Sequence, residues 1–449
     1  MREDKPNIIF ILSDDQGIWA SGCYGNEEIK TPHIDKLAQE GVRFENFFVV
    51  TPVCSPSRAT FLTGKIPSQH GIHDWIREGN VGKGSIRYLE GEIGYTDILA
   101  ENGYTCGISG KWHLGDSQHP QMSFTHWFVH QFGGGPYFGA PMVKEGKLVC
   151  IKEYITQAIT DSALEFIEEN KDRPFYLSVH YTAPHSPWIG QHPKEFVDLY
   201  KDCPFQSCPQ EPIHPWAKDC WLTQEYLGNR EALKGYFAAV TAMDYHIGRI
   251  LKKLEDLNLR EKTLIIFASD NGFSCGHHGF WGKGNGTKPR NMYENSIKVP
   301  FIVSYPGKFP EGNVVRALVS NYDFFPTLLD FLHLPLPEGN YPGKSFLPLL
   351  EGKEEPTREF VVVFDEYGPV RMIRTKEWKY VHRYPDGPHE LYNLEEDPEE
   401  RENLIKEPAY KKKIKELKGE MEEWFKKFVI PEKDGLLQDG FSDGQVKKG

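Results

Sequence analysis

Two apolar runs that lie far apart in the sequence end in the same way. Residues 8–12 and 264–268 are each followed by a serine, and then by Asp14 and Asp15 in the first case and by Asp270 and Asn271 in the second. An unbroken apolar run of this length is typical of a strand covered on both faces, as in a parallel α/β sheet. Such sheets bind ligands at the carboxyl ends of their strands. The two runs therefore predict an α/β fold with four oxygen-bearing side chains at one sheet edge.

The rest of the chain predicts how that sheet is covered and where it ends. Apolar spacing over residues 229–257 predicts a long amphipathic helix, whereas residues 117–150 show no clear period and are expected to form loops. Residues 351–356 are charged and turn-rich, which places a boundary there. We predict a large mixed, mostly parallel sheet sandwiched by helices in residues 1–355. Residues 356–449 are expected to form a smaller antiparallel sheet packed with a helix, with a loosely held end after residue 434.

Composition excludes several classes of protein. The 449 residues carry a formal net charge of −12, so no basic surplus is available for nucleic acid. No apolar run approaches the roughly 18 residues that span a membrane, and residues 8–12 are too short for a signal-peptide core. We expect a cytoplasmic protein, or a secreted or periplasmic one if a leader was removed. The eight cysteines are scattered, unlike those of a disulfide-stapled module.

The four side chains at the expected sheet edge suit a hard cation. Two adjacent carboxylates repel each other, and a divalent cation relieves that repulsion. Calcium or magnesium prefers such oxygen ligands, and the absence of thiolate or paired histidine ligands disfavours zinc. Viewed alone, Asp14 and Asp15 fit a solvated turn equally well. The repeated pattern favours a metal site formed by Asp14, Asp15, Asp270 and Asn271.

A proline-rich stretch, residues 51–64, contains the most distinctive cysteine. Pro52 and Pro56 restrict the backbone on either side of Cys54. A helix is expected to begin after Ser57, which would place Cys54 just ahead of a helix N-terminus, where the helix dipole and Arg58 favour anions. Taken alone, Cys54 fits a buried structural thiol at least as well.

This stretch also resembles the signature of the type I sulfatases, formylglycine-dependent members of the alkaline phosphatase superfamily. The signature reads Cys-x-Pro-Ser-Arg followed by an apolar pair, Thr and Gly, and residues 52–64 meet every position. Residues 103–113 resemble the family's second signature, departing from it at Cys106, where Ser or Thr is preferred. The resemblance extends from residue 7 to about residue 404. It implies that a formylglycine-generating maturation enzyme oxidises Cys54 to formylglycine, whose hydrated aldehyde is the nucleophile.

The resemblance also implies roles for the other residues. Asp14, Asp15, Asp270 and Asn271, with the modified Cys54, would hold calcium, with magnesium possible. Arg58 would hold the formylglycine hydroxyls, and His113 would take the proton when sulfate is expelled. The residues expected to contact the sulfate or substrate are Lys111, His185, Lys283, His277 and His278. Lys288 competes with Lys283 for the role of sulfate-binding lysine, and His277 and His278 are also compatible with plain loop residues.

These observations predict a sulfuric ester hydrolase that cleaves a sulfate monoester, with a small sulfated sugar or oligosaccharide as substrate. Charge stabilisation, an activated nucleophile and a proton donor are what such a reaction requires. The alternatives are a phosphomonoester or phosphonate ester hydrolase of the same superfamily, and an unmodified protein that binds sulfated ligands. The loops at residues 70–90, 117–150 and 189–229 are expected to select the substrate, and their aromatic residues suit stacking on a sugar ring.

Overall fold

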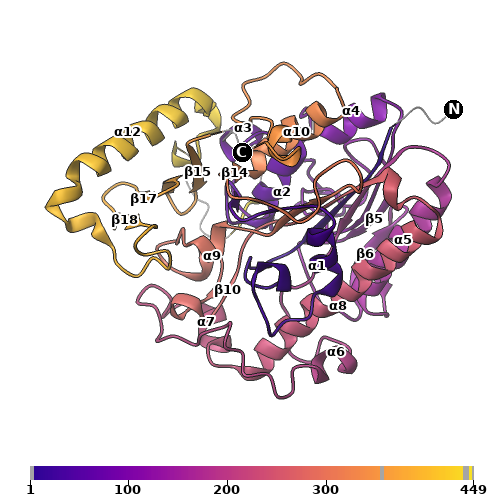
Figure 1. Ribbon diagram of the computed structural model, residues 1–449, viewed down its shortest axis with the longest axis horizontal. Helices are drawn as coiled ribbons and strands as arrows, with labels where there is room; N and C mark the ends of the chain where they lie inside the picture. The colour runs from indigo at the N-terminus through magenta and orange to yellow at the C-terminus, as the bar shows by residue number, and fades with distance from the viewer. Residues whose placement is uncertain (1–4, 354–357, 438–443, 447–449) are drawn as a thin grey trace.

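A ten-stranded mixed sheet forms the centre of the protein (Figure 1). The computed structural model describes residues 5–353, 358–437 and 444–446. Five central strands run parallel: β9 (Thr263–Ser269), β1 (Asn7–Ser13), β8 (Phe175–His180), β4 (Thr105–Gly110) and β5 (Phe124–His130). The flanking strands, in sheet order, are β13 (Asn313–Val315), β2 (Val42–Phe44) and β12 (Phe301–Ser304) on one side, and β6 (Ala140–Lys144) and β7 (Lys147–Ile151) on the other. The predicted mixed, mostly parallel sheet is confirmed.

Helices cover both faces of the sheet. The side chains of each central strand therefore alternate between two hydrophobic cores, one on each face. Ile9 and Ile11 of β1 pack in one core, together with α1 (Pro32–Gln39), α5 (Ile155–Asn170) and α8 (Arg230–Asp256). Ile8, Phe10 and Leu12 pack in the other, whose helices are α2 (Cys54–Thr63), α4 (Tyr95–Glu101), α10 (Phe324–Phe331) and α11 (Leu347–Leu350). Since both faces are covered, the strands are apolar throughout. The long helix expected over residues 229–257 is α8.

Shorter elements connect these layers. The remaining helices are α3 (Pro67–His70), α6 (Lys194–Asp198), α7 (Trp221–Tyr226) and α9 (Glu294–Ile297). Two small sheets pair β3 (Phe47–Phe48) with β14 (Val319–Ser320), and β10 (Ser274–Cys275) with β11 (Trp281–Gly282). None of the helices in the described residues is long and apolar enough to cross a bilayer.

The C-terminal part forms a separate antiparallel sheet with one long helix, as predicted. Its strands are β15 (Phe360–Asp365), β16 (Val370–Thr375), β17 (Trp378–Arg383) and β18 (Glu390–Asn393), and α12 (Lys411–Phe428) packs on them (Figure 1). Val50, Ile66 and Tyr322 of the larger unit share a core with this sheet and helix. The predicted boundary between residues 355 and 356 lies outside the described residues, so the division into two domains stays a prediction.

The expectation of loops over residues 117–150 was wrong. The segment contains β5, β6 and β7, which extend the sheet at one edge. Strand β7 has exposed and half-buried residues and no apolar alternation, and β5 carries exposed Thr125. These strands lie toward or at the edge of the sheet and carry exposed residues, so they lack the unbroken apolar run that identified β1 and β9. The prediction of a loose end after residue 434 was also wrong for Gln445, which is fully buried.

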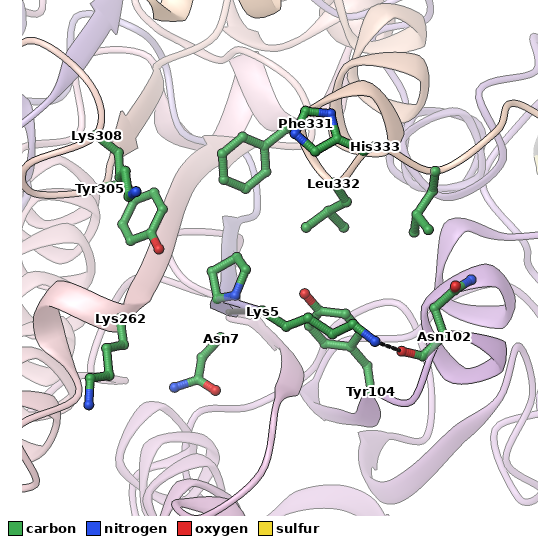
Figure 2. A pocket seen from close by; sticks show the side chains of 12 residues that line it. Lys5, Asn7, Asn102, Tyr104, Lys262, Tyr305, Lys308, Phe331, Leu332 and His333 are labelled. Atoms are coloured by element: carbon green, nitrogen blue, oxygen red, sulfur yellow. Dashed lines mark hydrogen bonds between the residues drawn. The ribbon is translucent and has the colours of Figure 1, made fainter. Parts of the chain in front are cut away.

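A cavity of about 660 Å³ lies at the amino ends of the strands (Figure 2). Asn7 at the start of β1 and Lys262 just before β9 belong to its lining. Figure 2 shows the rings of Tyr305 and Phe331 on one side of this cavity, and Lys5 donating a hydrogen bond to the carbonyl of Asn102 at 3.1 Å. The cavity is one strand length away from Asp14 and Asp270, so it is separate from the acidic residues at the carboxyl ends.

Helix α8 should be a main source of stability, because most of one face is buried against the sheet. We expect Ile247→Ala to lower the free energy of unfolding by about 2–5 kcal/mol, since Ile247 is fully buried. Lys252→Ala, at an exposed position of the same helix, should change it by no more than about 0.5 kcal/mol. Chemical denaturation followed by tryptophan fluorescence measures both. Equal effects of the two changes would contradict the packing described for α8.

Candidate active site

Three carboxylates meet where β1 and β9 end. The two strands pair in parallel with Ser13 opposite Ser269, so the residues that follow the two strands lie side by side. The backbone N–H of Asp15 donates to Oδ1 of Asp270 at 3.3 Å. Ligand atoms of Asp14, Asp15, Asp270 and Cys54 all lie within 4.8 Å of one another, and all four residues are buried. The amide of Asn271 joins them by donating to Oδ1 of Asp15 at 2.6 Å.

Cys54 is the first residue of α2, and not a residue ahead of the helix as expected. Val53, in an extended conformation, is the N-cap, and the helix runs from Cys54 to Thr63. Pro56 does not prevent this early start, because the first turn of a helix does not need the N–H groups that proline lacks. All ten residues of α2 are buried. The thiol of Cys54 points to the carboxylates, with Sγ 3.7 Å from Oδ1 of Asp14.

Three buried cationic side chains compensate the carboxylates. Lys111 Nζ donates to Oδ2 of Asp14 at 2.6 Å, and Arg58 Nε donates to Oδ2 of Asp270 at 2.9 Å. Lys283 Nζ reaches Asp15 Oδ1 at 2.5 Å, Cys54 Sγ at 2.9 Å and Asn271 Oδ1 at 3.1 Å. Lys288 is exposed. Of the two lysines considered, the structure therefore places Lys283 beside Cys54.

His113 lies just beyond β4 and has an unusual backbone conformation. The strand ends at Gly110, and His113 has φ of +54°, so Lys111 and His113 do not lie on one face of an extended strand. The ring nitrogen Nε2 is 2.9 Å from the carbonyl oxygen of Ile76. Because a carbonyl only accepts, Nε2 carries the proton. The other nitrogen, Nδ1, is buried without a hydrogen-bond partner among the described residues.

A close backbone approach holds the ring of His113. A Cβ at Gly133 would lie 2.2 Å from Cε1 of His113, so only glycine fits against this ring. The next glycine, Gly134, lies against the ring of His185, whose Nδ1 is 2.8 Å from the Ser186 carbonyl oxygen and whose Nε2 is 3.8 Å from Oδ2 of Asp15. The sequence did not identify Ile76 or Gly133, since a backbone carbonyl and a missing side chain leave no chemical signature.

A cavity of about 540 Å³ opens above these groups. Asp15, Cys54, Lys111, His113, His185 and Lys283 belong to its lining. Each of the three loop segments expected to select the substrate contributes to its walls: Trp75, Arg77 and Asn80, then Phe132, Gly133 and Gly134, then Trp221 and Leu222. Trp221, which the sequence did not single out, is 60% exposed at this cavity.

His277 and His278 are not among the residues that line this cavity. Nε2 of His277 lies 2.9 Å from the Ser207 carbonyl oxygen, and the ring of His278 stacks on Tyr293 with centroids 4.0 Å apart. Both rings therefore have partners within the protein.

Burial and neighbouring charges shift the pKa values of the clustered residues in different directions. Burial and the nearby Asp270 raise the pKa of Asp14. For Asp15, burial acts in the same direction, but Lys283 and His185 outweigh it and lower the pKa. Burial also opposes ionisation of Asp270, yet Arg58 and Lys111 hold its pKa below the usual range. Burial and the adjacent Lys111 hold the pKa of His113 well below its usual range, so this ring is neutral.

The donor set fits a hard divalent cation. It offers carboxylate oxygens of Asp14, Asp15 and Asp270 and the amide oxygen of Asn271 within a buried cluster. Such oxygen ligands suit Ca²⁺ or Mg²⁺, and no histidine belongs to the cluster. The residues present are therefore compatible with the cation that the sequence predicts.

Comparison with known proteins places this geometry in context. A family model described as Sulfatase matches residues 6–334, and one described as N-sulphoglucosamine sulphohydrolase, C-terminal, matches residues 276–427. The chain is 30% identical to the N-acetylglucosamine-6-O-sulfatase of Bacteroides thetaiotaomicron, over 94% of this chain and 87% of that protein. It is 28% identical to the arylsulfatase of Clostridium perfringens, over 98% and 96%. A protein solved in complex with its substrate D-glucosamine-2-N,6-O-disulfate superimposes with a TM-score of 0.82 at 28% identity, over 96% of this chain and 99% of that chain.

An unmodified Cys54 should react slowly with alkylating reagents. Burial raises the pKa of its thiol to about 12, despite the opposing effect of Lys111 and Lys283. At pH 8 only about one molecule in 10,000 then carries the reactive thiolate, and the fraction stays below about 1% up to pH 9. Iodoacetamide labelling of folded protein, read by peptide mass, should modify exposed Cys150 first and leave Cys54 intact. Rapid labelling of Cys54 at pH 7 would contradict this electrostatic description.

Proposed function

Since the chain belongs to the sulfatase family and is a sulfuric ester hydrolase, we propose that its substrate is a sulfated carbohydrate and that Cys54, converted to formylglycine, is its nucleophile. One observation carries the proposal: Lys283 and the cluster of carboxylates converge on Cys54 Sγ at the base of a cavity. A sulfate ester bound there would place its sulfur next to position 54 and its charged oxygens among buried cations.

The environment of Cys54 supports the modification. A thiol with a raised pKa is a poor nucleophile, and a sulfur adduct would not readily release sulfate. A hydrated aldehyde at this position supplies a hydroxyl nucleophile and can expel sulfate by reforming its carbonyl. The modification requires a formylglycine-generating maturation enzyme as a partner. Arg58, held by Asp270, is suited to orient the hydroxyls through its position one helical turn after Cys54.

The clustered oxygen donors support a resident calcium ion, with magnesium as the second choice. The three carboxylates of Asp14, Asp15 and Asp270 are formally balanced by Arg58, Lys111 and Lys283. When bound, a divalent cation supplies two further positive charges, which stabilise an anionic substrate. Asp14, Asp15, Asp270 and Asn271 would hold it.

The side chains around position 54 have complementary roles in this proposal. Lys111 and Lys283 neutralise the sulfuryl oxygens, because both are buried cations that line the cavity. His113 takes the proton when sulfate is expelled, since its ring is neutral and Nδ1 is free to accept. His185, which also lines the cavity, assists the departing oxygen. We assign no role in the reaction to His277 and His278, because they lie outside the lining of the cavity and contact other groups of the protein.

Aromatic side chains at the mouth of the cavity support the proposal that the substrate is a carbohydrate. Trp75, Phe132 and Trp221 belong to its lining, and Phe132 and Trp221 are 42% and 60% exposed. Exposed aromatic rings suit stacking on a sugar. Two of the compared proteins carry names that specify a sulfated glucosamine or N-acetylglucosamine as substrate.

A reducing compartment such as the cytoplasm is the proposed location, because all eight cysteines are free thiols.

A substrate panel tests the proposed reaction. Protein made together with a maturation enzyme should release sulfate from sulfated glucosamines and from an aryl sulfate, and should act at least about 100-fold more slowly on matched aryl phosphate and phosphonate esters. Cys54→Ala should retain its fold and lose turnover by about 10⁴-fold or more. The mass of the tryptic peptide 44–58 reports whether position 54 is formylglycine.

Two results would contradict this proposal. Faster turnover of the phosphate or phosphonate ester would favour the phosphoester hydrolase alternative. Unchanged thiol mass at position 54, combined with tight binding and no hydrolysis of the sulfated ligand, would favour a binding protein.

Removal of divalent cations tests the metal site separately. Chelation should abolish turnover, and calcium should restore it and raise the melting temperature, because the ion binds the oxygen ligands that only the folded protein brings together. Asp15→Asn should lose both effects. Asp244→Asn is the matched control, since Asp244 is a buried carboxylate that accepts backbone N–H groups of α1 outside this cluster. Full turnover after exhaustive chelation would exclude the calcium proposal.

A further inference from the structure

A short segment near the C-terminus, residues 444–446, packs behind one wall of the active-site cavity. The backbone N–H of Gln445 donates to the carbonyl of Trp75 at 2.8 Å, and the carbonyl of Gln445 accepts from the N–H of Arg77 at 2.9 Å. Gln445 thereby forms a parallel bridge with Ile76. Gly444 lies against the ring of Trp75, where a Cβ would approach Cε2 to 2.7 Å. Trp75 and Arg77, on either side of Ile76, both line the cavity.

The side chain of Gln445 binds the same loop a second time. Its Oε1 accepts from the N–H of His73 at 2.8 Å, and its Nε2 donates to the carbonyl of Gly71 at 2.9 Å. Both ends of the amide are therefore used, and the residue is fully buried. Together with its backbone bonds, Gln445 fixes the path of residues 71–77 from the outside of the cavity.

The loop that Gln445 holds contacts the chemistry directly at Ile76. The N–H of Ile76 donates to Oγ of Ser55, the residue after Cys54, at 3.1 Å. The carbonyl of Ile76 is the acceptor 2.9 Å from Nε2 of His113. The backbone of Ile76 therefore connects the start of α2 to the ring of His113. If its carbonyl turned away, the proton of His113 would be free to move to Nδ1.

We propose that Gln445 is a positioning residue of the active site: by holding residues 71–77 it aims the Ile76 carbonyl at His113 and keeps Nδ1 of that ring free. Gln445 does not contact substrate in this account. The inference rests on the proposed function for the role of His113 as a proton acceptor. It assigns an active-site task to a segment that follows the C-terminal sheet and helix.

The task is separable from stability because Gln445 lies outside the two main cores of the large sheet. Val446 is 37% exposed, and the strand-like pairing seen within the described residues 444–446 is the bridge of Gln445 to Ile76. Removing the Gln445 side chain should therefore leave the two main cores of the large sheet intact. Its loss leaves the Gly71 carbonyl and the His73 N–H without this partner, which loosens the loop locally.

Two substitutions at position 445 test the proposal on matured, calcium-loaded enzyme, with a substitution of the neighbouring residue Val446 as the control. Gln445→Ala and Gln445→Met should lower kcat by about 10- to 100-fold, because small displacements of a catalytic group have effects of that size. KM should change by less than about threefold and the melting temperature by less than about 2 °C. Val446→Ala should behave as the unsubstituted protein. A kcat within about twofold of that protein for both Gln445 variants would overturn the proposal.

A second measurement determines the tautomer of the His113 ring without relying on turnover. Imidazole ¹⁵N chemical shifts distinguish the Nε2–H from the Nδ1–H tautomer, and the His113 signal is assigned by its loss in His113→Gln. The unsubstituted protein should show the Nε2–H form, and Gln445→Ala should show a mixture. An unchanged tautomer in Gln445→Ala would overturn the proposal even if kcat falls, because the effect would then be structural. If the unsubstituted protein hydrolyses no sulfate ester, the proposed function fails, and the tautomer comparison still decides the role of Gln445.

Discussion

The parallel pairing of β1 with β9 is the constraint on which the rest of the site depends. With Ser13 opposite Ser269, the residues that follow must bring Asp14, Asp15 and Asp270 together out of contact with water. An isolated buried carboxylate costs several kcal/mol unless a cation or hydrogen bonds compensate it. The compensation comes from three segments that are distant in sequence, at Arg58, Lys111 and Lys283. The start of α2, the end of β4 and the loop after β11 are thus all drawn to one sheet edge.

The parts of this arrangement that could be predicted are those that a local pattern determines. The apolar runs of β1 and β9 and the periodicity of α8 identified the central layers, and the polar residues after the two strands identified the acidic cluster. The strands β5, β6 and β7 escaped prediction because they carry exposed residues toward the sheet edge, which weakens the apolar pattern. Likewise, the conformation of His113 depends on Gly133 and the Ile76 carbonyl, which reach it from separate loops. Contacts of this kind arise only from the tertiary fold.

The cavity divides into two parts with different physical demands. At its base, charged groups are buried and balanced against one another, so a change in any one of them leaves an uncompensated charge. At its mouth, Trp75 and Phe132 come from two separate loops and Trp221 from the start of α7, and none of the three bears a charge. Substitutions at the mouth carry no such electrostatic penalty. The mouth is therefore the part of the cavity that can change with the substrate while the charged base is kept.

The boundary between the two sheets is not a boundary between functions. Asp365, at the end of β15, accepts from Arg290 at 2.7 Å, and the same guanidinium lies 3.3 Å from Asp74 in the loop before Trp75. Glu366 lies 2.5 Å from Nδ1 of His73 in that loop. Residues 71–77 are therefore held by the C-terminal sheet as well as by Gln445. Because a loop that lines a cavity must keep its shape without a strand or helix of its own, the C-terminal part supplies the rigid support that this wall requires.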